Sequence, residues 1–254
     1  MPAAFLTRKD YDEMKQTKID WCDCTVNPVV GCPRGCEYCY ARKMNTRFGW
    51  VKDFSQPKFY PERLKQLESK NPKSVFINSM SDIAYWEQRW LGEVSNAINK
   101  TNHKYIMLTK NYELFTKRFN VFQACNYGKI FIGTTITTQK EADNLYQGAS
   151  FINVEPILEP IILPLPYHTI NGLASYEQLQ QLIIGAETGN RRGKVIPKKE
   201  WIDDIVKSAD KHGIRVFMKE SLRRIMGGDF RKDKLIWEVE KDENQIIAEK
   251  AVGE

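Results

Sequence analysis

The sequence predicts an α/β fold built on a sheet of parallel strands. Six short apolar runs are nearly continuous rather than alternating, as expected for strands that are buried on both faces. Stretches with helical character lie between several of these runs, and this alternation favours right-handed βαβ units. The six runs are residues 75–77, 105–108, 130–132, 151–154, 182–184 and 214–218.

Helices are expected over residues 90–100, 111–119, 139–148 and 199–212. Asn111 is a suitable N-cap for the second of them, and Gly213 follows the last as a C-terminal stop. A further strand is expected within residues 19–30. This strand leads into a cysteine-rich loop, so the loop follows the first strand of the sheet.

Three cysteines, Cys32, Cys36 and Cys39, form the pattern C-x3-C-x2-C, and Tyr38 precedes the last of them. Cysteine thiolates are the usual ligands of iron–sulfur clusters. A [4Fe–4S] cube has four irons, so three ligands leave one iron without a protein thiolate. Substrate or cofactor chemistry takes place at such an open position. The pattern therefore predicts a cluster with one open iron.

Other uses of these cysteines remain open. A structural zinc site needs four ligands, and Cys22 or Cys24 could supply the fourth. Six cysteines in 254 residues are too sparse for a disulfide framework, and the sequence shows no secretory signal. No stretch approaches the ~20 apolar residues of a membrane span. We therefore expect a cytoplasmic protein that does not enter a membrane.

Polar or charged residues follow each apolar run. Sites in parallel α/β proteins lie at the carboxyl ends of the strands, so these residues should meet at one rim. Glu155 and Glu187 are notable because a carboxylate at a buried strand end needs a partner. The polar groups occupy residues 78–82, 109–110, 133–135, 155–156, 185–189 and 219–220.

The cysteine pattern resembles the signature of the radical S-adenosylmethionine (SAM) superfamily. Over residues 20–219 the order of motifs resembles a phage-type radical-SAM-like family. The resemblance implies a partial (β/α)6 barrel, with the cluster loop after the first strand. We expect this barrel in residues 1–228 and a charged C-terminal extension in residues 229–254. The matching segments are 20–21, 27–29, 78–82, 108–110, 155–156, 185–189 and 217–219.

This resemblance also implies the chemistry and its cofactors. Cys32, Cys36 and Cys39 would hold a [4Fe–4S] cluster, and its open iron would bind SAM. Reductive cleavage of SAM yields a 5′-deoxyadenosyl radical that abstracts a hydrogen atom from the substrate, and a flavodoxin or ferredoxin would supply the electron. The implied SAM contacts are Tyr38 near the adenine, Ser79, Ser81 and Asp82 at the amino group, Thr134 and Thr135 at the carboxylate or ribose, Glu155 at the ribose, and Gly185 and Glu187 beside the adenine.

The catalytic residues and the substrate are less defined. Cys22, Cys24, Cys125, Tyr38 and Tyr40 are candidates for a hydrogen-atom donor, and nothing in the sequence singles one out. The net charge is +6, and residues 191–234 carry a local excess of +7 that would attract phosphate or simply be solvated. By analogy with spore photoproduct lyase, the substrate is expected to be a nucleic acid or nucleotide. The alternative is a nucleic-acid-binding protein with a structural zinc or iron–sulfur site, and a one-electron carrier is a third possibility.

Overall fold

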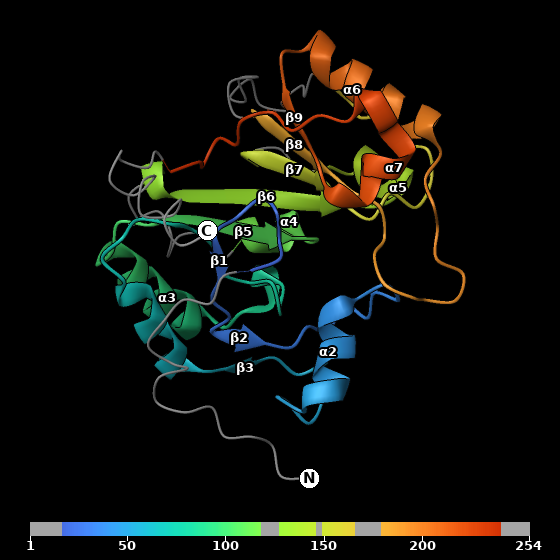
Figure 1. Cartoon of the computed structure of the whole chain (residues 1–254). Coiled ribbons are helices and arrows are strands. Elements are labelled where there is room, and N and C mark those ends of the chain that lie inside the picture. The colour runs from blue at the N-terminus through green and yellow to red at the C-terminus, as the bar shows by residue number, and fades with distance from the viewer. Residues whose placement is uncertain (1–16, 118–126, 146–148, 166–178, 240–254) are drawn as a thin grey trace, which may run out of the picture.

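The computed structural model describes residues 17–117, 127–145, 149–165 and 179–239. Seven parallel strands form one sheet that curls into a half-barrel (Figure 1). Along the sheet the strands are β1 (Cys24–Thr25), β4 (Ser74–Phe76), β5 (Lys104–Thr109), β6 (Ile130–Ile136), β7 (Phe151–Val154), β8 (Gln181–Ile184) and β9 (Arg215–Met218).

Helices and a small second sheet surround this half-barrel. The second sheet pairs β2 (Val29–Val30) with β3 (Lys58–Phe59) in antiparallel fashion. The α-helices are α2 (Tyr40–Phe48), α3 (Gln88–Asn99), α4 (Tyr112–Thr116), α5 (Gln139–Asp143), α6 (Lys199–Lys211) and α7 (Arg223–Met226). The 3-10 helices are η1 (Pro61–Glu68), η2 (Ile83–Tyr85), η4 (Tyr127–Lys129), η5 (Glu220–Leu222) and η6 (Gly227–Asp229).

The predicted parallel α/β architecture is confirmed. All six apolar runs contribute strands to the sheet, and β1 supplies a first strand within residues 19–30. Asn111 caps α4 as expected, because its side chain accepts a hydrogen bond from the Leu114 backbone N–H at 3.1 Å. The sheet has seven strands, one more than the six of a (β/α)6 barrel.

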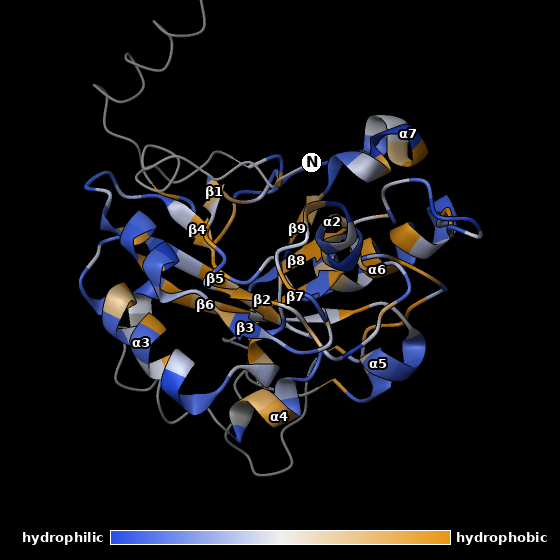
Figure 2. Ribbon diagram, turned by 90° about the horizontal axis from the view of Figure 1, so that it is seen from below, coloured by the Kyte–Doolittle hydropathy of each residue, from blue (hydrophilic) through white to orange (hydrophobic). Residues whose placement is uncertain are grey.

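The core on the outer side of the sheet lies beneath the helices. The buried side of α3 packs against one end of the sheet through Leu91 and Ile98, and α6 packs against the other end through Ile202 and Ile205. Figure 2 shows apolar strands at the centre and mixed polar and apolar helices around them. Among the described residues, no helix is both long and apolar enough to cross a membrane.

An aromatic cluster fills the interior of the half-barrel at one end. Trp237 is 0% exposed, and its ring centroid lies 4.7 Å from that of Phe151 on β7. The Trp237 indole N–H donates to the backbone carbonyl of Trp21 at 2.8 Å. Trp237 lies in the predicted C-terminal extension, so this part of the extension completes the barrel core. The other members of the cluster are Phe76, Ile106, Ile183 and Phe217.

Candidate functional site

A cavity of about 480 Å³ lies at the carboxyl edge of the sheet, above the aromatic cluster. Cys32, Cys36 and Cys39 all line it. Parallel strands present alternate side chains to the interior, so the polar residues after the strands can reach the same space. The predicted site residues in its wall are Tyr38, Ser79, Ser81, Asp82, Thr135, Glu155 and Glu187.

Backbone hydrogen bonds fix the cysteine loop over the cavity. The Gly31 N–H donates to the Met80 carbonyl at 3.0 Å, and the Cys32 N–H donates to Phe54 at 2.7 Å. Cys39 is the N-cap of α2, and its sulfur accepts a hydrogen bond from the Arg42 N–H at 3.4 Å. This bond places the Cys39 sulfur at the N-terminal end of α2.

The donor atoms at this wall suit a soft metal such as iron or zinc. Burial raises the pKa of Cys32 to about 12, so a thiolate there needs a positive partner such as a metal. Within the described ranges, no group of three or more His, Cys, Asp or Glu side chains is arranged to hold a metal ion. The residues thus fit a cluster in donor type and number, without forming a ready-made site for a single ion.

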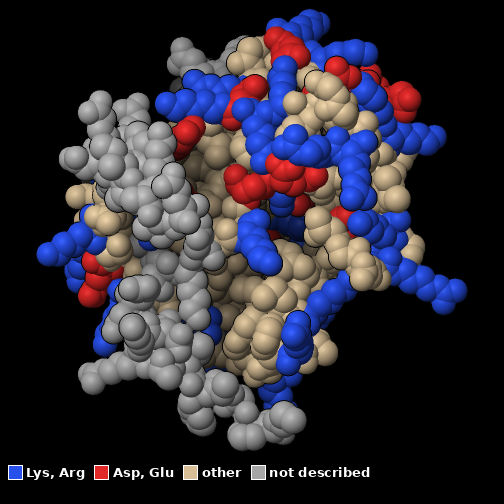
Figure 3. All heavy atoms as spheres, in the orientation of Figure 1, with Lys and Arg blue, Asp and Glu red and all other residues tan. Residues whose placement is uncertain are grey.

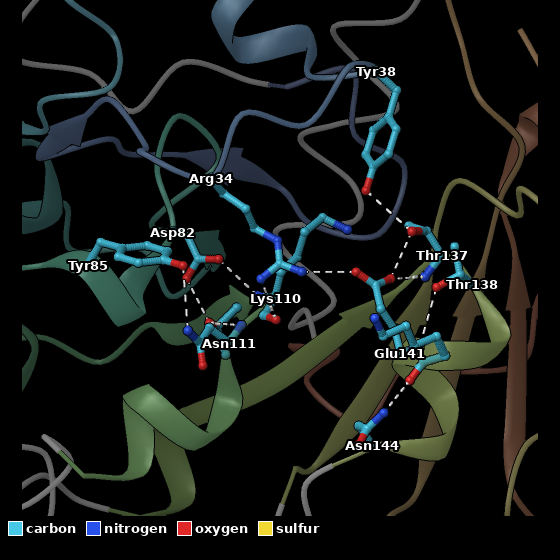
Figure 4. Close-up of polar contacts among 12 residues, drawn as sticks. Arg34, Tyr38, Asp82, Tyr85, Lys110, Asn111, Thr137, Thr138, Glu141 and Asn144 are labelled. Atoms are coloured by element: carbon cyan, nitrogen blue, oxygen red, sulfur yellow. Dashed lines mark hydrogen bonds and ion pairs between the residues drawn. The ribbon is translucent and has the colours of Figure 1, made fainter.

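A polar network ties the cysteine loop to β5 and α5 (Figure 4). Arg34, between the first two cysteines, donates to the Lys110 carbonyl and to Glu141 Oε1, both at 3.0 Å. The other carboxylate oxygen of Glu141 accepts from the N–H and hydroxyl of Thr137 at 2.7 and 2.8 Å. The Tyr38 hydroxyl donates to the Thr137 hydroxyl at 3.4 Å. The network therefore holds the cysteine loop against the residue that follows β5 and against α5.

Asp82 is the N-cap of η2, in the segment that follows β4. One carboxylate oxygen accepts from the Ala84 N–H at 3.0 Å and the Thr109 hydroxyl at 2.7 Å, and the other accepts from the Lys110 N–H at 2.9 Å. These bonds join the start of η2 to the end of β5. They occupy the oxygens that were expected to receive an amino group, although Asp82 still lines the cavity.

The two predicted serines also have partners in the protein. Ser79 donates to Asn27 Oδ1 at 3.0 Å, and the Trp86 indole N–H donates to the Ser81 hydroxyl at 3.0 Å. Asn27, in the matched segment before the cysteines, also accepts from the Met80 N–H at 2.9 Å. These contacts shape the wall beside the cysteine loop.

Both glutamates singled out in the sequence have cationic partners. Lys219, which directly follows β9, contacts Glu155 at 2.5 Å, and Arg191 forms two bonds to Glu187 at 2.7 and 2.8 Å. The hydrogen bonds from Arg191 lower the pKa of Glu187. Gly185 was expected beside an adenine, but a Cβ there would lie 3.0 Å from Lys219 and 3.2 Å from Glu155. The glycine makes room for this ion pair.

Strand alternation separates the two predicted threonines. Thr135 lines the cavity, and its neighbour Thr134 therefore faces the opposite side of β6. The Thr134 side chain is buried there, since the residue is only 5% exposed. The structure thus places only Thr135 where a ligand in this cavity could reach it.

Three further residues of the cavity wall each carry a buried polar atom; Lys110 belongs to the predicted rim, whereas Trp21 and Asn153 were not predicted as site residues. Trp21 Nε1, Lys110 Nζ and Asn153 Oδ1 are buried and have no hydrogen-bond partner among the described residues. A buried polar atom without a partner is costly, so these atoms mark where a ligand can bind. Asn153 had a signal in the sequence, because it is the one polar residue in an otherwise apolar run.

Of the hydrogen-donor candidates, Tyr38 and Tyr40 line the cavity, whereas Cys22 and Cys24 lie outside it. Cys24 is 1% exposed in the core and donates to the Ser74 carbonyl, and Cys22 packs against the aromatic cluster. Burial raises the pKa of both thiols, that of Cys24 to about 11. They behave as small apolar groups, as free buried cysteines usually do. Cys125 lies outside the described residues.

Together these features define an α/β half-barrel that carries three cysteines on the wall of a polar cavity. The chain belongs to the family described as "Protein of unknown function (DUF5131)", which matches residues 16–245. No curated protein and no solved structure matches the chain.

Proposed function

We propose that this protein is a radical SAM enzyme whose [4Fe–4S] cluster is held by Cys32, Cys36 and Cys39. The supporting observation is that all three cysteines line one cavity at the carboxyl edge of the parallel half-barrel. In this proposal the half-barrel corresponds to a partial (β/α)6 barrel, and the cysteine loop after β1 is the cluster loop. A cytoplasmic flavodoxin or ferredoxin would serve as the reductant.

The residues of the cavity would bind and orient the cofactors. The backbone bonds at Gly31 and Cys32 and the Arg34–Glu141 pair would keep the three thiols at the wall. The Tyr38 ring, Thr135 and the Glu155 carboxylate would provide surfaces and hydrogen bonds for SAM. When bound, the cluster would supply an electron for reductive cleavage of SAM to a 5′-deoxyadenosyl radical, which would abstract a substrate hydrogen atom.

Anaerobic reconstitution followed by a SAM cleavage assay tests this proposal. The wild-type protein should hold iron and acid-labile sulfide and should release 5′-deoxyadenosine from SAM and dithionite. Cys36→Ala should lose both properties, whereas Cys22→Ala, a matched cysteine packed against the aromatic cluster, should keep them. A protein that retains its cluster and yet releases no 5′-deoxyadenosine would contradict the proposal.

The substrate we propose is a single-stranded nucleic acid or a nucleotide, and the exposed side of α2 supports this. Tyr40, Met44 and Phe48 recur every four residues and are 48%, 39% and 49% exposed. The helix carries three cationic and no acidic side chains. Phe48 stacks on Trp50 with ring centroids 5.1 Å apart.

Aromatic faces beside cationic groups are how proteins bind single strands without reading sequence. Figure 3 shows Lys and Arg side chains bordering the tan surface at the lower right, where α2 lies in Figure 1. Tyr40 also lines the cavity, so this surface reaches the cavity mouth. A strand on α2 would therefore be able to present a base or sugar to the cavity.

Fluorescence anisotropy with labelled dT20 and U20, from 50 to 200 mM salt, tests the substrate class. Phe48→Ala should weaken binding about tenfold, the value of one lost stacking contact. Replacing Lys43 and Arg47 with Gln should flatten the salt slope by about 1.4, or 0.7 for each phosphate contact. Lys207→Gln on α6 is the control for charge. A wild-type affinity independent of salt would contradict this assignment.

The alternative is a nucleic-acid-binding protein with a structural zinc or iron–sulfur site. It requires a fourth ligand, expected from Cys22 or Cys24, which pack in the hydrophobic core. Metal and sulfide analysis distinguishes the two functions, because iron with acid-labile sulfide excludes zinc, and a fourth protein thiolate would remove the open iron.

A further inference from the structure

We propose that the cavity binds an anionic group, a carboxylate or a phosphate, through the ammonium of Lys110. Lys110 follows β5 and lines the cavity, and its Nζ is buried with no hydrogen-bond partner among the described residues. An ammonium buried without a partner is costly, and an anionic ligand would supply the missing one. This inference goes beyond the proposed function, because it does not require a cluster.

The carboxylates near Lys110 are already occupied by other donors (Figure 4). Both oxygens of Asp82 accept from Ala84, Thr109 and the backbone N–H of Lys110 itself. The Glu141 carboxylate likewise accepts hydrogen bonds from Arg34 and Thr137. The guanidinium fixes the Lys110 carbonyl but leaves the Lys110 ammonium without an acceptor.

An aromatic ring completes the surroundings of this ammonium. The Lys110 Nζ lies 5.2 Å from the centroid of the Tyr38 ring. A cation–π contact stabilises the charge but leaves its three N–H donors without hydrogen-bond acceptors. Burial lowers the pKa of Lys110, and a bound anion would oppose this shift because it favours the charged form. This geometry therefore suits binding of an oxyanion by the Lys110 ammonium.

Neighbouring atoms indicate what else the ligand carries. Thr109 pairs with Thr134, and Thr135 pairs with Asn153, so Lys110, Thr135 and Asn153 follow one another across β5, β6 and β7. Adjacent strands lie about 4.8 Å apart, which puts Lys110 and Asn153 about 10 Å apart along this row. The unpartnered Asn153 Oδ1 accepts a hydrogen bond. The ligand should thus combine an anionic end with a hydrogen-bond donor.

Equilibrium dialysis with two pairs of probes tests the inference and identifies the anion. SAM and decarboxylated SAM differ by a carboxylate, and AMP and adenosine differ by a phosphate. Each probe is measured against the wild type, Lys110→Met and Lys207→Met, with and without a reconstituted cluster. Lys207 on α6 is a matched control, because its side chain is 77% exposed and Lys207→Met removes one positive charge, as Lys110→Met does.

Lys110→Met should weaken binding of the probe that carries the recognised carboxylate or phosphate about 10- to 100-fold, the range for a hydrogen-bonded charge. The counterpart that lacks this group should bind as before, and Lys207→Met should change neither. The affected pair shows whether the group is a carboxylate or a phosphate. The inference is overturned if the wild type binds neither SAM nor AMP, or if Lys110→Met binds both as tightly as the wild type.

A purely structural role for Lys110 gives a different result. Removing an unpartnered ammonium should leave the thermal midpoint of Lys110→Met unchanged or raised. A lysine needed for folding would lower the midpoint, and one needed only to hold the cluster would reduce the cluster content alone. Lys110→Gln provides a second neutral variant, and failure of both variants to fold would overturn the inference. These experiments measure binding and stability, so their result does not depend on whether the protein cleaves SAM.

Discussion

The ion pair between Arg34 and Glu141 should stabilise the cysteine loop, and its contribution can be measured. The two side chains are 28% and 27% exposed, and Arg34 Nη2 lies 3.0 Å from Glu141 Oε1. Glu141→Gln retains the size and one carbonyl oxygen but removes the charge. We expect it to lower the free energy of unfolding by about 1–2 kcal/mol, below the full value of a charged hydrogen bond because water still reaches the pair.

The energy of this pair can be isolated with a double-mutant cycle in urea, combining Arg34→Met with Glu141→Gln. We expect a coupling of about 1 kcal/mol. The control is Arg89–Glu93 on α3, also at 3.0 Å but with Arg89 82% exposed. Such a surface pair contributes about 0.3–0.5 kcal/mol. A coupling for Arg34–Glu141 no larger than that of the control would refute the structural role of this pair.

The same pair gives a pH dependence with a defined sign. Burial acts to raise the pKa of Glu141, but the hydrogen bond from Thr137 and the charges of Lys110 and Arg34 outweigh it, so the pKa lies below its ordinary value of 4.5. A carboxyl with a lowered pKa in the folded state stabilises the fold above its unfolded value. The stability difference between wild type and Glu141→Gln should therefore be full near neutral pH and shrink as the pH falls below 4.5.

Two further predictions concern the barrel interior. A Cβ at Gly133 would lie 2.4 Å from the Phe151 ring, so Gly133→Ala should cost about 1–3 kcal/mol in urea unfolding, and adding Phe151→Leu should recover part of the loss. Equal stability of Gly133→Ala and wild type would contradict this contact. Trp237→Ala should cost about 3–5 kcal/mol, because Trp237 is 0% exposed in the inner cluster. A thermal midpoint unchanged by that substitution would mean that the segment around Trp237 is not part of the core.

The parallel sheet could be predicted because its signal is local. Strands covered on both faces must be apolar at nearly every position, and runs such as 151–154 showed this pattern. The residues after each strand end were predicted to share a rim, and Asp82, Glu155 and Glu187 do line one cavity. Topology explains this success, since the carboxyl ends of parallel strands lie at the same edge.

Partners across the sheet could not be predicted in the same way. Glu155 pairs with Lys219, 64 residues away, and Arg34 pairs with Glu141, 107 residues away. No local pattern encodes such contacts, because they depend on how strongly the sheet curls and on which side chains point inward. The separation of Thr134 from Thr135 has the same origin, since it depends on which face of β6 is the inner one.

The amino-acid sequence alone determined the repeated strands and helices, the spacing of the three cysteines and the polar groups that follow the strands, since each depends on residues close together in the chain. Only the tertiary structure decided which polar atoms are satisfied. Closing the half-barrel over Trp237 and pairing most of the charges left Trp21, Lys110 and Asn153 each with a buried atom that lacks a hydrogen-bond partner in the cavity wall. Whether a polar atom is satisfied depends on every group that folding brings around it.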